Sequence, residues 1–255
     1  MAAEGHSPVH QFEIRDLIPF HVGGIDASFT NSSLYMVLAL GLITFFLTSA
    51  MRTGSLVPGR MQSMAELTYK FVADLVRDSV GEEGMKFFPL VFSLFVFVLV
   101  LNLLGMIPIP GVTFTVTSHI AVTAALAFLV IGIVVGYGLY AHGLGFFKLF
   151  VPSGVPWPML ILLVPIEIIS FISRPVSLSV RLFANLLGGH MALKIFAGFV
   201  GTLLTAGVGY ALLSPLPLAL TVALTALEVL VAALQAYVFA VLTCIYLSDA
   251  VHGGH

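Results

Sequence analysis

Five long apolar runs determine what this chain can fold into. They cover residues 34–51, 87–109, 120–140, 157–204 and 218–247. A helix rises about 1.5 Å per residue, so roughly 20 apolar residues cross the hydrocarbon core of a bilayer. Only 9% of the 255 residues are charged, against about 25% in soluble domains, and the mean hydropathy is +1.11. We therefore predict an all-α membrane protein with about five spans, in a single integral membrane domain over 1–255.

The basic residues predict how the chain is oriented. Residues 1–33 form a polar segment without the basic start and early apolar core of a signal peptide, so the run 34–51 is interpreted as a retained span. Arg52 follows the first run and Lys148 the third, whereas the loop 112–118 contains neither Lys nor Arg. The positive-inside rule then predicts that the N-terminus lies outside.

The stretch 60–86 has the pattern of an amphipathic helix. Its apolar residues recur every three or four positions, with charged residues between them; the apolar ones are Met61, Met64, Leu67, Phe71 and Leu75. This pattern predicts a helix that lies at the membrane surface. A short soluble helix packed on a partner protein is the alternative.

The last two apolar runs are longer than a perpendicular crossing requires. Pro158, Pro165 and Pro175 interrupt the first half of 157–204, and glycines and prolines between 207 and 217 separate that run from 218–247. We predict two long antiparallel helices that form a strongly tilted hairpin.

The run 157–204 also contains polar and charged side chains that are rare in membrane helices. They include Glu167, Arg174, Arg181, His190 and Lys194. A charge at the centre of a membrane helix costs about 2.5–3.5 kcal/mol on insertion scales, so an ion path or a buried ion pair is the default explanation. Ser177, Arg181 and Asn185 follow the i, i+4 spacing and share one helix face.

The hairpin geometry brings His190 and Glu228 together. The two residues lie at similar distances from the middle of the predicted turn, so the common helix rise makes them facing partners. A histidine beside a carboxylate in a low-dielectric site can handle protons near neutral pH. A hydrogen bond that only holds the hairpin together is the alternative. Gln235 lies seven residues after Glu228 and extends the polar stripe.

Arg181 requires a different interpretation. Arginine does not release its proton, so Arg181 can act only as a fixed positive charge. Glu167 is about four turns away on the same helix, and no other acid is an obvious partner. We expect the partner acid on another chain; an internal salt bridge made possible by a kink at Pro175 is the alternative.

Two segments resemble subunit a of the F-type ATP synthase. The first is RPVSLSVRLFAN at 174–185, and the second is LQAYVFAVLTCIYLS at 234–248. NLLGMIP at 102–108 and TSH at 117–119 give a weaker match. The resemblance implies a non-catalytic membrane stator without cofactors, which faces the ring of c subunits and contacts b-type peripheral-stalk subunits. It implies a bacterial plasma membrane, with the mitochondrial inner membrane as the alternative.

The resemblance also implies roles for individual residues. Arg181 would separate two aqueous half-channels, an inner one lined by Glu167 and an outer one. The outer one would be lined by Asn185, His190, Glu228 and Gln235. Ser177 and Asn102 complete the candidate ion-translocation set. Many bacterial members carry the acid at the position of His190 and the histidine at that of Glu228, and this exchange favours direct contact between the two.

Other function classes fit the sequence less well. A stand-alone proton-coupled transporter is the alternative, but it predicts internal repeats, and the sequence has none. No basic segment indicates nucleic-acid binding, and no Gly-rich phosphate loop is present. Cys244 stands alone, which excludes a disulfide or thiolate metal framework. The histidine in the proposed pair favours H⁺ over Na⁺ as the transported ion, because a histidine nitrogen is a poor ligand for a hard cation.

Overall fold

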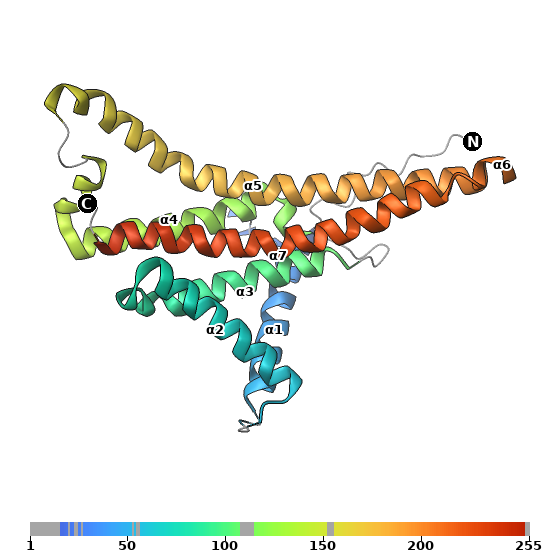
Figure 1. Cartoon of the computed structure of the whole chain (residues 1–255), viewed down its shortest axis with the longest axis horizontal. Coiled ribbons are helices and arrows are strands. Elements are labelled where there is room, and N and C mark those ends of the chain that lie inside the picture. The colour runs from blue at the N-terminus through green and yellow to red at the C-terminus, as the bar shows by residue number, and fades with distance from the viewer. Residues whose placement is uncertain are drawn as a thin grey trace.

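The computed structural model describes residues 16–19, 21–22, 25–26, 28–52, 54, 57–107, 115–151 and 156–252. Five of its helices are long and apolar enough to cross a membrane. They are α1 (Asn31–Met51), α3 (Phe88–Gly105), α4 (Ile120–His142), α5 (Trp157–Thr205) and α7 (Pro215–His252). The predicted all-α membrane protein is thus confirmed (Figure 1).

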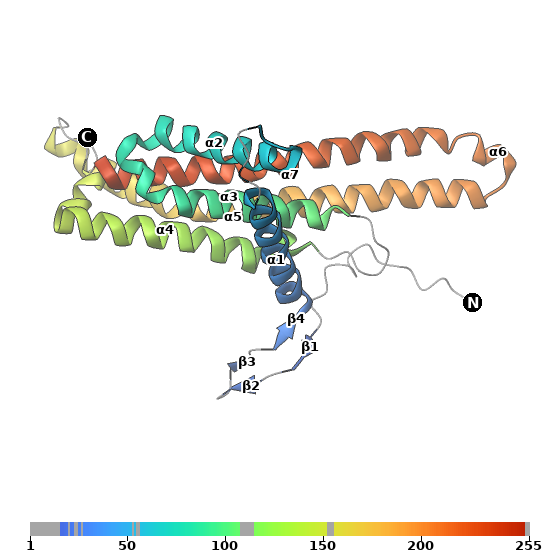
Figure 2. The same ribbon diagram turned by 90° about the horizontal axis from the view of Figure 1, so that it is seen from below.

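The N-terminal segment contains short strands that the sequence did not indicate. β1 (Asp16–Ile18) pairs antiparallel with β4 (Phe29–Thr30), and β2 (His21–Val22) pairs with β3 (Ile25–Asp26). The strands lie at the start of α1 (Figure 2). The hydroxyl of Thr30 accepts a hydrogen bond from the backbone N–H of Ser33 at 3.3 Å and caps α1, which therefore begins before the apolar run at Leu34.

The amphipathic helix α2 (Arg60–Val80) ends earlier than predicted. Gly81 follows it with a φ of +85°, a conformation that favours glycine, and a 3₁₀ helix, η2 (Glu82–Phe87), continues into α3. The buried face of α2 consists of small and β-branched residues: Ala65, Val72, Ala73, Val76 and Val80. The predicted stripe that contains Met61, Met64 and Leu67 is exposed and stays available to a membrane surface.

The main core forms where α5 and α7 cross α2, α3 and α4. Leu178, Leu182 and Leu186 recur at every fourth position of α5 and are fully buried, and Phe239 and Leu247 of α7 pack into the same cluster. Their spacing keeps them on one stripe of each helix. The polar stripe of α5 is consequently turned away from this core.

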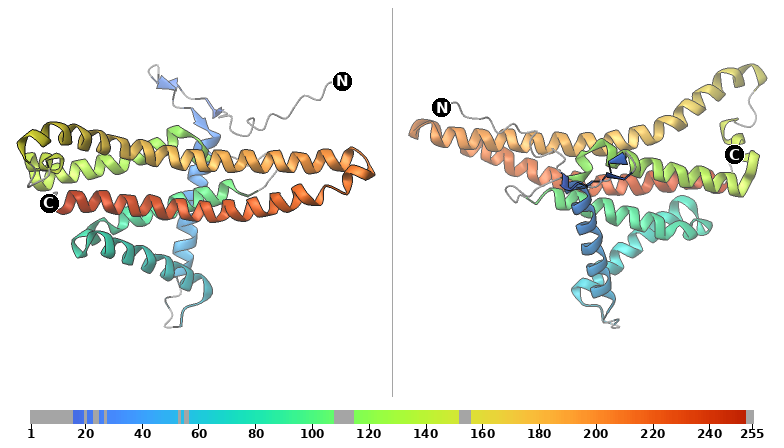
Figure 3. Two further views of the ribbon diagram at one scale, coloured as in Figure 1. Left: turned by 45° about the horizontal axis from the view of Figure 1, so that its top comes forward. Right: turned by 180° about the vertical axis from the view of Figure 1, so that it is seen from behind.

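The two longest helices lie side by side and are joined by a tight turn at one end (Figures 1 and 3). The turn contains Gly207, whose φ is +123°, and the short helix α6 (Val208–Ala211). α7 starts at Pro215, a favourable first helical position, and extends beyond the predicted 218–247 at both ends. α5 contains Pro165 and Pro175 and changes direction in its first half (Figure 1).

The helix α1 runs in a different direction from the long pair. It crosses the direction of α5 and α7 steeply in all three overall views (Figures 1, 2 and 3). With 21 residues α1 matches an upright crossing, whereas α5 has 49 residues and would extend about 74 Å if straight.

Candidate functional site

The structure distributes the candidate residues over three helices. α5 carries Glu167, Ser177, Arg181, Asn185 and His190, α7 carries Glu228 and Gln235, and α3 carries Asn102. The residues from Asn185 onwards meet at the α5–α7 contact. Ser177 and Arg181 lie on the exposed side of α5, and Glu167 lies near the other end of this helix.

His190 and Glu228 face each other across the α5–α7 contact. The His190 Nδ1 atom lies 3.3 Å from the Glu228 Oε1 atom, so the contact expected from the hairpin geometry is present. Gly189 makes this approach possible, because a Cβ atom there would lie only 2.5 Å from the same carboxylate oxygen. The Glu228 side chain is 4% exposed, and neither of its oxygens accepts a hydrogen bond from a residue that the structure describes.

A pocket opens next to the Glu228 carboxylate. It has a volume of about 220 Å³ and is lined by Asn185, Gly189, Leu224, Leu227, Glu228 and Val231. That volume holds several water molecules, and the unsatisfied carboxylate oxygens supply polar partners for them. Glu228 is therefore buried by protein while it borders a space that water can occupy.

Two amides extend the polar contacts away from Glu228. The Asn185 Nδ2 atom donates to the Gln235 Oε1 atom at 3.1 Å, and the Asn102 Nδ2 atom donates to the backbone carbonyl of Ala232 at 3.1 Å. Gln235 Nε2 and Asn102 Oδ1 are buried without a partner among the described residues. Unpaired buried amide atoms of this kind are costly unless water or another chain satisfies them.

Arg181 is exposed and makes no ion pair with any residue in the described ranges. The internal salt bridge considered for it is thus not formed there. Its neighbours Leu178 and Leu182 point into the core, whereas Arg181 lies beside their stripe on α5 with its side chain exposed. Such a charge on a membrane helix has to be neutralised by something other than this part of the chain.

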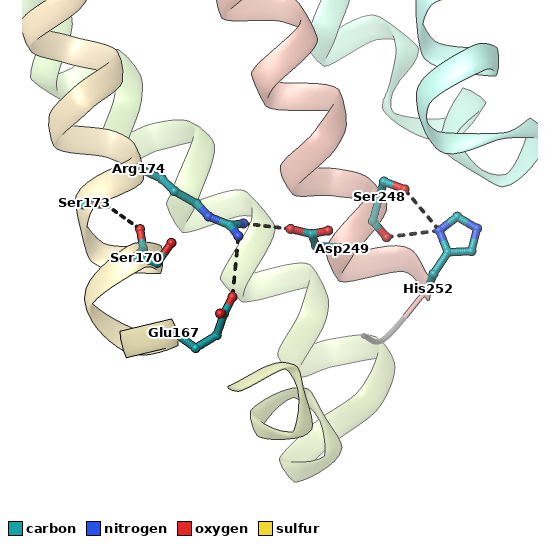
Figure 4. Close-up of polar contacts among 7 residues, drawn as sticks. All are labelled: Glu167, Ser170, Ser173, Arg174, Ser248, Asp249 and His252. Carbon is teal, nitrogen blue, oxygen red and sulfur yellow. Dashed lines mark hydrogen bonds and ion pairs between the residues drawn. The ribbon is translucent and has the colours of Figure 1, made fainter. Parts of the chain in front are cut away.

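The guanidinium of Arg174, seven residues before Arg181, forms ion pairs within the chain (Figure 4). Its Nη1 atom lies 2.7 Å from Asp249 Oδ2, and its Nη2 atom lies 3.9 Å from Glu167 Oε1. The guanidinium also lies over the rings of Phe171 and Tyr246, at 5.6 and 5.2 Å from their centroids. The two arginines therefore differ in kind: one binds α5 to the end of α7, and the other is free to meet a partner.

The Arg174 pair gives a stability prediction. Asp249→Asn keeps an acceptor oxygen but removes the negative charge closest to the partly buried guanidinium of Arg174, so we expect the free energy of unfolding to fall by about 1–3 kcal/mol. Thermal unfolding of the detergent-solubilised protein complex measures this change. The matched control is Asp74→Asn, which removes an exposed 4.0 Å pair with Arg77 and should cost less than about 1 kcal/mol. Equal losses in both variants would contradict the role of Asp249.

Sequence reasoning missed two residues of this region. Asp249 lies beyond the predicted apolar run 218–247, but α7 continues to His252 and places Asp249 beside Arg174. Thr115 lies in a threonine-rich loop, and its Oγ1 atom is 3.0 Å from His190 Nε2. His252 at the end of α7 is exposed and contacts Ser248 (Figure 4).

Comparison with known proteins identifies relatives over the whole chain. The family model for the ATP synthase A chain matches residues 33–248. A protein of Mesorhizobium japonicum named ATP synthase subunit a is 61% identical over 255 residues, covering all of both chains. A protein of the same name from Chelativorans sp. is 62% identical over 248 residues, which cover 97% of this chain and 98% of the relative. A third, from Rhodopseudomonas palustris, is 60% identical over 256 residues, which cover all of both chains. The chain therefore belongs to the ATP synthase A chain family.

Proposed function

We propose that this chain is the non-catalytic, proton-translocating stator subunit of an F-type ATP synthase. The observation that carries the proposal is the exposed, unpaired Arg181 on the same helix as a buried histidine–carboxylate pair. In the proposed complex the uncovered face of α5 meets the carboxylates of a ring of c subunits. A ring carboxylate then supplies the negative charge that the described part of this chain does not place beside Arg181.

The outer half-channel leads to the ring through His190 and Glu228. Water in the pocket beside Glu228 brings a proton to this pair, which delivers it to a ring carboxylate. Asn185 and Gln235 hold α5 and α7 together at the same level and offer further polar atoms along the route. Once protonated, the ring carboxylate is neutral, so it can move into contact with lipid at little electrostatic cost.

Arg181 completes the cycle as a fixed charge. A guanidinium does not lose its proton, so it blocks direct passage between the two half-channels and favours ionisation of each ring carboxylate that approaches it. The released proton leaves on the inner side, past Glu167. Each proton that moves across 100 mV contributes about 2.3 kcal/mol to rotation.

The orientation follows from the basic residues. Arg52 and Arg60 follow α1, and by the positive-inside rule they support an N-terminus on the outer side. The steep crossing of α1 against α5 and α7 supports a strong tilt of the long pair, if α1 stands upright in the bilayer. The bacterial source of the relatives supports a location in the bacterial plasma membrane.

Purification in mild detergent tests the proposal. Membranes that contain a tagged copy of the chain should yield a complex with a ring of small hairpin proteins and b-type stalk subunits. The complex, once placed in vesicles, should acidify their interior when ATP is supplied. A monomer that transports protons on its own would contradict the stator role.

A further inference from the structure

The imidazole of His190 has an oxygen atom near each of its ring nitrogens. Its Nδ1 atom lies 3.3 Å from Glu228 Oε1, and its Nε2 atom lies 3.0 Å from Thr115 Oγ1. Thr115 is 5% exposed and precedes the 3₁₀ turn η3 (Val116–Ser118). The His190 side chain is itself only 11% exposed, so its ring has few other partners.

Thr115 is fixed in place by its surroundings. The Ser118 hydroxyl donates to the Thr115 carbonyl at 2.6 Å, and the Ser118 N–H donates to the same oxygen at 3.1 Å. The Thr115 side chain packs closely on Gly105: a Cβ atom at Gly105 would lie 2.7 Å from the Thr115 methyl carbon. The Thr115 hydroxyl also lies 3.4 Å from the Gly105 carbonyl, so it has a second acceptor besides His190.

This geometry permits two hydrogen-bond arrangements with the same heavy-atom positions. In the first, the Thr115 hydroxyl donates to His190 Nε2, and the ring carries its proton on Nδ1, facing an ionised Glu228. In the second, Nε2–H donates to Thr115 Oγ1, the hydroxyl hydrogen turns to the Gly105 carbonyl, and Nδ1 faces a protonated Glu228.

The two arrangements differ by one proton. In the second, the pair holds one proton more, on the carboxyl group of Glu228, and the ring proton lies on Nε2 instead of Nδ1. His190 is neutral before and after, and Thr115 keeps its own proton throughout. A hydroxyl suits this position because it can both donate and accept, whereas an apolar side chain would leave Nε2 unpaired in either arrangement.

We propose that Thr115 is a positioning residue for proton transfer, whose rotating hydroxyl pairs with His190 Nε2 in both tautomers and so keeps the ring facing Glu228. The inference rests on the proposed function and adds to it a residue outside the α5–α7 hairpin. It also gives the turn before α4 a role, because Thr115 at the start of η3 places its hydroxyl beside the buried ring.

Two substitutions at position 115 separate the hydroxyl from the methyl group. Thr115→Val keeps the methyl group that packs on Gly105 and removes the hydroxyl. Thr115→Ser keeps the hydroxyl and removes the methyl group. Thr117→Val is the matched control: Thr117 is fully buried in the same turn, but its hydroxyl has no hydrogen-bond partner among the described residues. Each variant is studied in the whole ATP synthase complex in inverted membrane vesicles.

The initial rate of ATP-driven acidification, divided by the amount of assembled complex, is the readout. Thr115→Val should lower this rate about two- to tenfold, the range that corresponds to one hydrogen bond. Thr115→Ser and Thr117→Val should both stay within about twofold of the wild type.

Three outcomes would overturn the inference: an unchanged rate in Thr115→Val, an equal loss in Thr115→Ser, or an equal loss in Thr117→Val. The second would assign the effect to packing by the methyl group, and the third to the turn as a whole. Arg181→Ala is measured in the same series. If Arg181→Ala pumps normally, the proposed function fails; if it is inactive while Thr115→Val is normal, only the present inference fails.

Discussion

Replacing Arg181 by alanine is expected to lower ATP-driven proton pumping by more than about thirtyfold, because truncating one member of a desolvated charge pair costs about 2–5 kcal/mol. In the proposed mechanism, the guanidinium favours ionisation of the approaching ring carboxylate and separates the two half-channels, so its removal would take away both effects. Acidification of inverted membrane vesicles, normalised to the amount of assembled complex, measures the loss. Passive proton leak should rise in the same vesicles.

Arg52→Ala is the control for this loss of charge. Arg52 is an exposed arginine directly after α1, away from the α5–α7 contact, so its removal should leave pumping within about twofold of the wild type. Normal pumping by Arg181→Ala, with intact assembly, would contradict the assignment of Arg181 and most of the proposed mechanism.

Glu228→Gln should produce the second large effect. The substitution keeps the shape of the side chain but removes the group that exchanges protons, and such groups contribute about 10²–10⁴-fold to proton-transfer rates. We expect ATP-driven acidification to fall by at least about tenfold, since water in the adjoining pocket can carry part of the proton flow. The same vesicle assay measures this rate.

A double variant in which the acid and the histidine change places provides the control for Glu228. His190→Glu alone places two carboxylates within the 3.3 Å contact and should impair pumping, whereas His190→Glu combined with Glu228→His restores one acid and one histidine. We expect the double variant to pump faster than either single variant, with a coupling that double-mutant analysis can quantify. Strictly additive losses would show that the two side chains act separately.

The sequence predicts the helices and the central contact because both follow from regular geometry. The apolar runs determine where the spans lie, and the glycines and prolines around Gly207 and Pro215 mark the turn of the hairpin. Once the turn is placed, the constant rise of a helix brings His190 opposite Glu228. The absence of an acid near Arg181 is likewise visible in the sequence, and in the structure no described acid forms an ion pair with it.

The remaining contacts depend on details that periodicity does not give. Asp249 meets Arg174 because α7 continues past the apolar run. Thr115 contacts His190 from the position before the 3₁₀ turn η3, and a hydropathy pattern does not give such a contact. On α2, small residues such as Ala65 and Ala73 make a buried stripe that the periodicity of the larger apolar residues did not indicate.

Disulfide cross-linking tests the central claim most directly, namely that the face of α5 around Arg181 meets the ring. Ala184 is exposed on this face, and the native Cys244 is fully buried and does not compete. Ala184→Cys should cross-link under mild oxidation to a cysteine placed beside the ring carboxylate, whereas Phe45→Cys, on the exposed surface of α1, should not. If Ala184→Cys gives no ring product in an assembled complex, or Phe45→Cys gives as much, the proposed stator face is contradicted.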